Sequence, residues 1–364
     1  ESGHILPGSY DPTVSGAYAT DQVGVAALNA QDLIDPEIQR IVDQLNEVIV
    51  AKESNLFGFT KVYLDGQRSS IRIEETNLGN LVTDANLATA KQSDAKTMIA
   101  IQNGGGIRDD IGQVVVPAGG TGEPVEKATE EVPNVKPKGG ISETDIANTL
   151  RFNNGLTLVS VTAKELVDVI EHGVAATTMD DANTQGRFPQ VSGMAFSFDP
   201  TAEVGDRVQS LVVVDEDGKD ADVVVKKGEI VGDAARVFRI VTSDFLAGGG
   251  DGYPFPARDV MPLAQSEEAP RTGKATFAPD GSEQDALAEY LANNTSEQKP
   301  FEMVDTAREE DMRIQNLAFR EDTVIDGSPR STAGLGSAWT LLLIAGLLLS
   351  LIFGGKKLLR RKTA

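Results

Sequence analysis

Several residue types that build common active sites are missing or rare in this chain of 364 residues. It contains no cysteine, two histidines and 5% aromatic residues. The absence of cysteine excludes disulfides, thiolate-ligated zinc and thiol catalysis. His4 and His172 are too few for a multi-histidine metal centre, so we expect no metal or cofactor site in this chain.

Basic residues are also scarce. Lys and Arg number 33 against 55 Asp and Glu, which gives a net charge of −22. Such a surface repels phosphates at long range, so we do not expect a nucleic-acid binder. An anionic ligand would have to be held by local arginines. The 40% of hydrophobic residues suffice for a sizeable core, and the length suggests about two domains or one large domain with extensions.

The two ends of the chain differ from its middle. Residues 1–34 contain neither an initiator methionine nor a signal segment, and their hydrophobic residues show no helix or strand period. This pattern indicates the end of an upstream domain or a loose segment. Residues 35–54 carry an apolar stripe after Asp35-Pro36, which predicts a surface helix. Residues 55–320 alternate strand and helix patterns, so the predicted class is α+β. Within them, residues 114–139 are rich in Pro, Gly, Glu and Lys and are expected to form a surface insertion. Residues 59–64 (FTKVYL) alternate like a strand. Ser142 with Asp145 and Thr162 with Glu165 have the spacing of capping boxes, and the second predicts a helix to His172 that Gly173 ends.

The C-terminus has the pattern of a membrane anchor. After a linker over 321–337, residues 338–355 are uncharged and nearly all apolar, and about 20 such residues span a bilayer as a helix. Five bases in the tail 356–364 favour the cytoplasmic side. The globular part is then expected in the periplasm or at the cell surface. A sorting signal that is removed by processing, or a buried core helix, are the alternatives.

Two motifs combine arginine with glycine-rich or junction segments. Arg72 precedes ETNLGNL at a predicted strand-to-helix junction, and Arg108 follows NGGGI at a predicted strand end. Glycines let the backbone approach a ligand, and an arginine can bind phosphate or carboxylate with two hydrogen bonds. Each motif alone is also compatible with a plain turn and a solvated arginine.

Further loops contain aromatic and acidic residues. Phe152 begins FNNG, Phe245 lies in DFLAGGGDGY, and Asp251 lies six residues later. Two aromatic rings can enclose a flat heterocycle, and a carboxylate can accept hydrogen bonds from sugar hydroxyls. Together with the arginines, these residues describe a nucleotide site.

Taken in order, the motifs resemble the C-terminal, substrate-specificity domain of the 5′-nucleotidase family. They are RIEETNLGNLVTDA, QNGGGIR, TDIANTLRFNNGLTLVSVTAKELVDVIEHG, GRFPQVSGMAFSFDP and TSDFLAGGGDGYPF, over about residues 55–295. The resemblance implies an α/β/β/α-type domain, with 35–54 as the linker helix to an N-terminal domain. It also implies phosphate contacts by Arg72 and Arg108, with Arg68 as a third family arginine, and a site lined by Asn103, Gly105 and Gly106. Phe152 and Phe245 would stack the base, and Asp251 would hold ribose.

The sequence departs from the family in lacking the D-x-H, GNH(E/D) and GHxH motifs of its two-metal phosphoesterase domain. We therefore expect hydrolysis, and its two divalent metal ions, to belong to an N-terminal domain outside this chain. His172 is expected to be structural. The alternatives are a non-hydrolytic nucleotide-binding surface module, or a family member that acts on 2′,3′-cyclic nucleotides, nucleotide sugars or sulfur substrates.

Overall fold

The computed structural model describes residues 35–117, 122–179 and 184–325. The chain divides into two compact units, Glu1–Lys52 and Glu53–Ala364. The described part of the first unit belongs to helix α2, Pro36–Ser54, none of whose side chains is buried. Asp35 begins this helix as predicted, because its carboxylate accepts a 2.8 Å hydrogen bond from the backbone N–H of Glu37.

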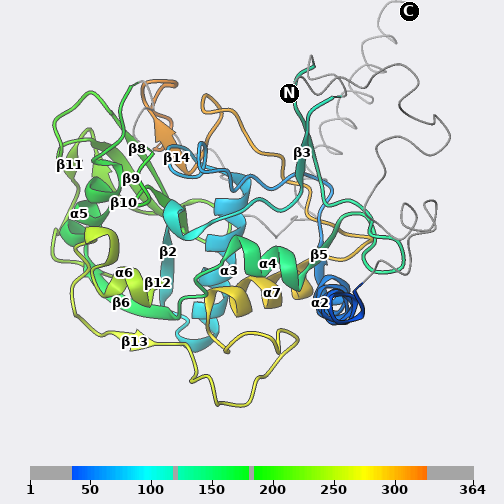
Figure 1. Cartoon of the computed structure of the whole chain (residues 1–364). Helices are drawn as coiled ribbons and strands as arrows, with labels where there is room; N and C mark the ends of the chain where they lie inside the picture. The colour runs from blue at the N-terminus through cyan, green and yellow to red at the C-terminus, as the bar shows by residue number, and fades with distance from the viewer. Residues whose placement is uncertain (1–34, 118–121, 180–183, 326–364) are drawn as a thin grey trace, which may run out of the picture. The chain divides into compact units, whose positions relative to one another are not determined.

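Two five-stranded sheets form the second unit (Figure 1), in the orders β13-β6-β12-β2-β7 and β11-β10-β9-β8-β14. The first contains β2 (Thr97–Asn103), β6 (Leu156–Thr162), β7 (Pro189–Ser192), β12 (Val237–Ser243) and β13 (Met261–Pro262). The second contains β8 (Met194–Phe198), β9 (Val208–Val214), β10 (Asp220–Lys226), β11 (Glu229–Ile230) and β14 (Ile314–Asn316). Gly193 joins β7 to β8 between the sheets with a φ of +72°, where glycine is favoured.

Apolar side chains bind these sheets and the helices into layers. Helices α3 (Asn77–Ser93) and α7 (Glu283–Asn294) pack on one face of the first sheet, where Leu87 and Ala286 contact Ala100 and Leu158. The opposite face packs on the second sheet in the largest core, which helix α5 (Ala163–Val174) shares. Strand β2 shows the reason, because alternate side chains point to opposite faces of a sheet: Ile99 and Ile101 enter the large core and Ala100 faces the helices.

The remaining elements are short. They are β1 (Leu56–Phe59), paired with β5 (Gly140–Ser142), the hairpin β3 (Gln113–Val115) with β4 (Val125–Lys127), helices α4 (Glu143–Thr149) and α6 (Asp244–Ala247), and the 3-10 helices η2 (Gly104–Gly106) and η3 (Gly250–Gly252). Strand β4 is exposed, as expected for an insertion over 114–139. The insertion is not exposed throughout, however. Lys136 is 7% exposed and forms ion pairs with Glu53 at 2.6 Å and Asp145 at 3.1 Å.

Local capping signals predict the helices well. Ser142 with Asp145 and Thr162 with Glu165 each form the predicted capping box. The strand expected over 59–64 is wrong in its bounds, because β1 ends at Phe59 and the Thr60 hydroxyl bonds the N–H and carbonyl of Val62. Helix α5 also continues to Val174, so Gly173 lies inside the helix and does not end it. A glycine fits at this position because a Cβ there would come within 2.9 Å of the Pro189 ring.

The predicted membrane helix 338–355 and basic tail 356–364 lie outside the described residues. Among the residues that the structure does describe, none of the helices is both long and apolar enough to span a bilayer.

Candidate functional site

Four loops converge at one edge of the first sheet. Strands β2 and β12 run parallel, so their carboxyl ends lie together. Strands β6 and β7 are antiparallel to these neighbours, and Leu156 opposite Ser243 and Pro189 opposite Asn103 show that both begin at the same edge. The segments around Phe152, Asn103, Gly186 and Phe245 therefore meet, although they are far apart in sequence.

These loops line a cavity of about 340 Å³. Its walls are Arg72, Asn103, Gly105, Gly106, Arg108, Phe152, Asn154, Gly186, Phe245 and Asp251. Eight of the nine predicted site residues are in this wall, and Arg68 is the exception. Asn154 and Gly186 were not singled out from the sequence, although both lie in the quoted motifs and at the strand starts that share this edge.

Arg72 is the buried charge of the cavity. It is 8% exposed, and its Nε atom has no hydrogen-bond partner among the described residues. Burial lowers the pKa of its guanidinium, the positive charges of Arg68 and Arg108 lower it further, and Asp251 acts in the opposite direction. A buried cation beside two like charges favours a bound anion, which would supply the missing partner.

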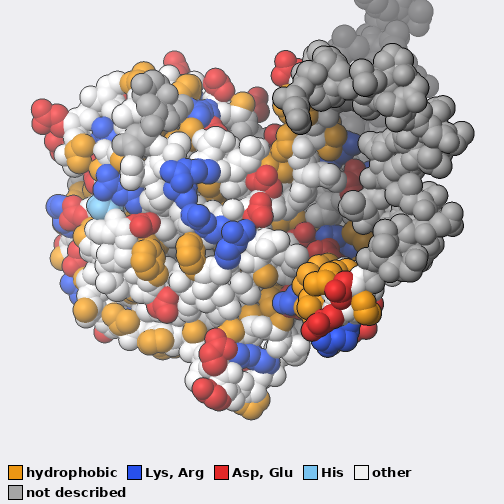
Figure 2. Space-filling model, viewed as in Figure 1, with side chains coloured by type: hydrophobic (Ala, Val, Ile, Leu, Met, Phe, Trp, Pro, Cys, Tyr) orange, Lys and Arg blue, Asp and Glu red, His pale blue; other side chains and the backbone are white. Residues whose placement is uncertain are grey.

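Arg68 lies in a second, more open cavity of about 550 Å³, which also includes Arg108. Asp109, Asp110 and Thr184 contribute to its walls. Arg108 thus belongs to both cavities. Figure 2 shows basic side chains running across the middle of this face, with hydrophobic side chains beside them.

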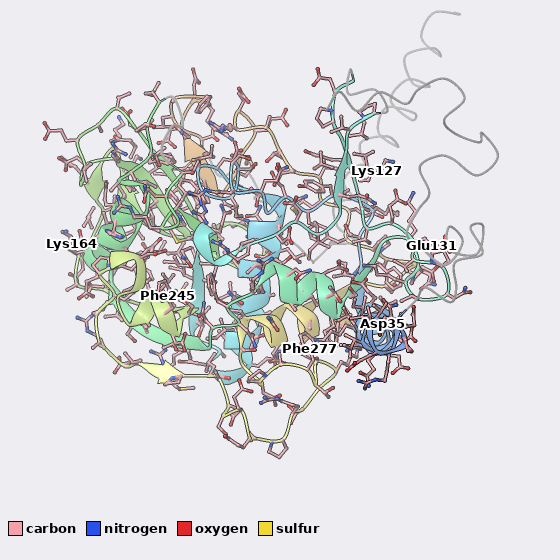
Figure 3. The ribbon with its side chains drawn as sticks, viewed as in Figure 1. Asp35, Lys127, Glu131, Lys164, Phe245 and Phe277 are labelled. Atoms are coloured by element: carbon pink, nitrogen blue, oxygen red, sulfur yellow. The ribbon has the colours of Figure 1, made fainter. Side chains whose placement is uncertain are left out.

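The two phenylalanines of the cavity are exposed rather than buried in the core. Phe152 is 60% and Phe245 45% exposed, whereas nearby Phe188 is 1% exposed. The Arg108 guanidinium lies over the Phe152 ring at 5.6 Å. Phe245 lies in α6 (Figure 3) and its ring covers Gly250, where an added Cβ would come within 2.6 Å of three ring carbons. Two exposed rings that line one cavity can take up an aromatic ligand.

Asp251 is held with its carboxylate toward the sheet edge. Its backbone is left-handed, with φ of 53°, an uncommon conformation for a residue other than glycine. Its Oδ2 atom accepts a 2.7 Å hydrogen bond from Asn103, and its carbonyl accepts one of 2.9 Å from Nε2 of His172. His172 thus supports the loop that carries Asp251, and its purely structural role stays a prediction.

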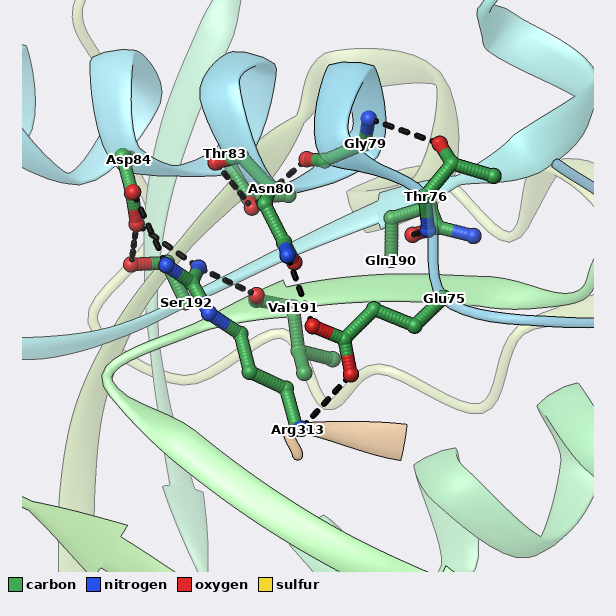
Figure 4. A network of polar contacts seen from close by, with 10 residues as sticks. All are labelled: Glu75, Thr76, Gly79, Asn80, Thr83, Asp84, Gln190, Val191, Ser192 and Arg313. Atoms are coloured by element: carbon green, nitrogen blue, oxygen red, sulfur yellow. Dashed lines mark hydrogen bonds and ion pairs between the residues drawn. The ribbon is translucent and has the colours of Figure 1, made fainter. Parts of the chain in front are cut away.

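A buried polar network fixes the turn that carries Arg72. Gln190 donates to the carbonyls of Ile71 and Glu74 at 3.1 and 2.7 Å. Glu75 accepts from the backbone N–H of Arg313 at 2.6 Å and from Asn80 at 2.7 Å (Figure 4). Since Gln190 also lies opposite Gln102 in the β2–β7 ladder, the Arg72 turn and the NGGG segment share one support.

Metal binding receives no support in this region. Within residues 35–117, 122–179 and 184–325, no group of three or more His, Asp or Glu side chains is placed to hold a metal ion. These residues therefore do not fit a two-metal centre, and we derive no chemical step through one. The expectation of two metals in an N-terminal domain stays a prediction.

The family model described as "5′-nucleotidase, C-terminal domain" matches residues 56–258, more than half of the chain. Among curated proteins, the trifunctional nucleotide phosphoesterase protein YfkN of Bacillus subtilis is 30% identical over 65% of this chain and 14% of its own length. The human 5′-nucleotidase is 27% identical over 62% of this chain and 35% of its own length. The chain therefore spans well under two thirds of these relatives.

A solved structure agrees with this match. The 5′-nucleotidase precursor of Thermus thermophilus superposes with a TM-score of 0.52 and 26% identity, over 76% of this chain and 42% of that one. The family match covers the cavity loops up to Asp251, whereas α7 and β14 lie beyond it. The chain belongs to the 5′-nucleotidase family, through its C-terminal domain.

Proposed function

We propose that this domain binds the nucleotide substrate of a 5′-nucleotidase-type phosphohydrolase. The observation that carries the proposal is Arg72, a buried guanidinium whose Nε atom has no partner among the described residues, in a cavity that also has two exposed phenylalanine rings. A nucleoside monophosphate has the matching parts: an anion, a polyol and a flat heterocycle.

The parts of the ligand correspond to parts of the cavity. Arg72 and Arg108 bind the phosphate, and Arg68 in the adjoining cavity adds a third positive charge. Phe152 and Phe245 stack the base between them. Asp251 accepts hydrogen bonds from the ribose hydroxyls, with Asn103 holding its carboxylate. Gly105 and Gly106 line the same cavity, and their backbone contacts the ligand.

Binding of this kind contributes to catalysis by positioning the phosphate ester. In the proposed whole protein, an N-terminal metallophosphoesterase domain supplies two divalent metal ions, which activate water and stabilise the transferring phosphoryl group. The relatives' names support a phosphoesterase, since they include a nucleotide phosphoesterase and 5′-nucleotidases. A non-hydrolytic nucleotide-binding module would use the same cavity, and the absence of the metal motifs from this sequence favours that behaviour for the chain by itself.

Calorimetric titration of the chain with AMP, adenosine and ribose 5-phosphate tests the proposal. We expect AMP to bind more tightly than either part, because it engages both ends of the cavity. Equal affinity for AMP and adenosine would contradict the phosphate assignment. This chain should release no phosphate from AMP when Mn²⁺ is added. Turnover that a chelator abolishes would contradict the assignment of hydrolysis to a separate N-terminal domain.

We further propose that the protein is extracytoplasmic and tethered by the segment 338–355. The support is the uncharged span followed by basic residues. A chain that ends at Arg330 should leave the membrane fraction and stay in solution. If the shortened chain still sediments with membranes in high salt, another anchor is present.

A further inference from the structure

The cavity loop that carries Phe152, residues 152–155, is hydrogen-bonded to a helix that lies outside the family match. Residues 152–155 lie against the N-terminus of α7, which begins 25 residues beyond position 258. Gln284 donates its backbone N–H to Asn153 at 3.1 Å and its side-chain amide to the Leu150 carbonyl at 2.9 Å. Glu283 holds Asn154, the residue of this loop that lines the cavity beside Phe152.

Glu283 and Asn154 are joined by three hydrogen bonds. The backbone N–H of Glu283 donates to the Asn154 carbonyl at 3.0 Å. In return, the Glu283 carboxylate accepts from the Asn154 backbone N–H at 3.0 Å and from its side-chain Nδ2 at 3.4 Å. Glu283 is 0% exposed, so this contact is shielded from water.

The charge state of Glu283 decides which end of the Asn154 amide is turned toward it. An ionised carboxylate only accepts hydrogen bonds, so it must face Nδ2. The side-chain oxygen of Asn154 is then the end that is left for a ligand, and Asn154 lines the cavity. Among the residues that the structure describes, that oxygen has no partner.

We propose that Glu283 is a positioning residue that makes Asn154 present a hydrogen-bond acceptor to the nucleobase, so that the cavity favours bases with an exocyclic amino group over their oxo counterparts. The proposal rests on the proposed nucleotide-binding function and adds the class of base. Glu283 acts through Asn154 and does not touch the ligand.

Replacing Glu283 with Gln should change this selectivity. The glutamine offers one acceptor, which the Asn154 backbone N–H occupies, and its amide N–H then requires the oxygen of Asn154. The Asn154 amide turns, and Nδ2 faces the cavity. We expect the wild-type chain to bind AMP more tightly than IMP, and Glu283→Gln to reduce the AMP/IMP ratio of affinities by about tenfold, the effect of one hydrogen bond. An unchanged ratio in the folded variant, or a wild-type preference for IMP, would overturn the proposal.

The chain contains a matched control in Glu143. It is also the first residue of a helix, α4, and is 8% exposed. Its backbone N–H donates to the Asn55 carbonyl at 2.9 Å, and its carboxylate accepts from Asn55 Nδ2 at 2.9 Å. This pair is absent from the cavity wall. Glu143→Gln should therefore leave the AMP/IMP ratio unchanged, and an equal change in both variants would contradict the proposal.

A pH series on the wild-type chain gives a second readout that needs no variant. Burial is the main cause that raises the pKa of Glu283, to about 7. Hydrogen bonds from Asn154 and Gln102 lower this pKa, and the negative charge of Asp244 raises it. When Glu283 is protonated it can donate to the Asn154 oxygen, so the AMP/IMP ratio should fall as the pH is lowered from about 8 to about 6, across that pKa. Phosphate ionisation affects both nucleotides and cancels in the ratio. A ratio constant across this range would count against the proposal.

The failure of this inference is distinguishable from the failure of the proposed function. If neither AMP nor ribose 5-phosphate binds, the proposed function is wrong and the inference is rejected with it. If AMP binds, Arg72→Met weakens that binding, and Glu283→Gln leaves the AMP/IMP ratio of affinities unchanged, then only the role assigned to Glu283 is wrong.

Discussion

Two arginines of the second unit are similarly buried but have opposite surroundings. Arg313 is 5% exposed, and its guanidinium binds both oxygens of Asp84 at 2.8 and 3.0 Å. Burial disfavours its charge, but the carboxylates of Asp84 and Glu75 outweigh that effect and raise its pKa. Arg72 is 8% exposed and lies near other arginines instead, with a lowered pKa.

The difference separates a structural cation from a binding cation. A buried ion pair is satisfied within the protein and has no need of a ligand. A buried guanidinium with an unpartnered nitrogen costs free energy in the empty domain, and an anion that binds there recovers it. The fold tolerates this cost at Arg72 because the Gln190 and Glu75 network fixes the turn around it.

The largest expected effect comes from Arg313→Met. The change leaves the carboxylate of Asp84 buried without its partner, which should reduce the free energy of unfolding by about 3–5 kcal/mol. Urea denaturation followed by circular dichroism measures it. Arg72→Met is the matched control and should not destabilise, because it removes a like charge from Arg68 and Arg108. Equal stability of the two variants would erase the distinction between the two arginines.

Arg72→Met should instead weaken binding. Charge-assisted hydrogen bonds to an anion contribute about 1.5–3 kcal/mol, so the dissociation constant of AMP should rise roughly 10- to 150-fold. The affinity for adenosine should change little. Calorimetry on both ligands tests the prediction, with exposed Arg151→Met as the control for lost net charge. Parallel losses for AMP and adenosine would show that Arg72 does not contact the phosphate.

A similar contrast applies to phenylalanines. Phe152→Ala and Phe245→Ala should each reduce AMP affinity by about 1–3 kcal/mol, the value of base stacking, with little change in melting temperature because both rings are exposed. Tyr at either position should retain binding. Phe188→Ala, in the core, should instead cost about 3–5 kcal/mol of stability. The stacking assignment fails if the cavity variants lose stability and keep their affinity.

The smallest effect is expected at a half-exposed ion pair. Arg258 binds Glu165 at 2.6 Å, with the side chains 40% and 29% exposed. Hydrogen bonds from Arg258 and Thr162 lower the pKa of Glu165 to about 2, below its usual 4.5. Its stabilising contribution is therefore complete above about pH 4.5 and is lost as the pH falls through about 2.

Arg258→Gln should accordingly lower the melting temperature slightly at about pH 6, and the difference from wild type should shrink as the pH falls and be lost below about 2, where the carboxylate of Glu165 is protonated. High salt should reduce it as well, because exposed pairs are screened. A difference that persists in acid would mean that Arg258 stabilises the fold by packing rather than by charge.

Much of the local structure was predictable because its causes are local. The capping residues Ser142 and Thr162 bond groups three positions away, so the sequence alone indicates where α4 and α5 begin. The strand over 59–64 was predicted wrongly because alternation does not show that the Thr60 hydroxyl bonds Val62 within its own segment. The family and its mixed α and β content were recognisable from the ordered motifs, and the match over 56–258 confirms both.

The sequence by itself determined which chemistry is available: arginines, glycine-rich loops, two phenylalanines in loops, and no cysteine. It did not determine which arginine is free to bind an anion, because Asp84, the partner of Arg313, is 229 positions away, while Nε of Arg72 finds no partner among the described residues. Nor did it connect Glu283 to Asn154, which lies 129 positions earlier. Tertiary structure decided these points, because the burial of a charged side chain and its pairing with an opposite charge depend on which distant segments the fold brings together.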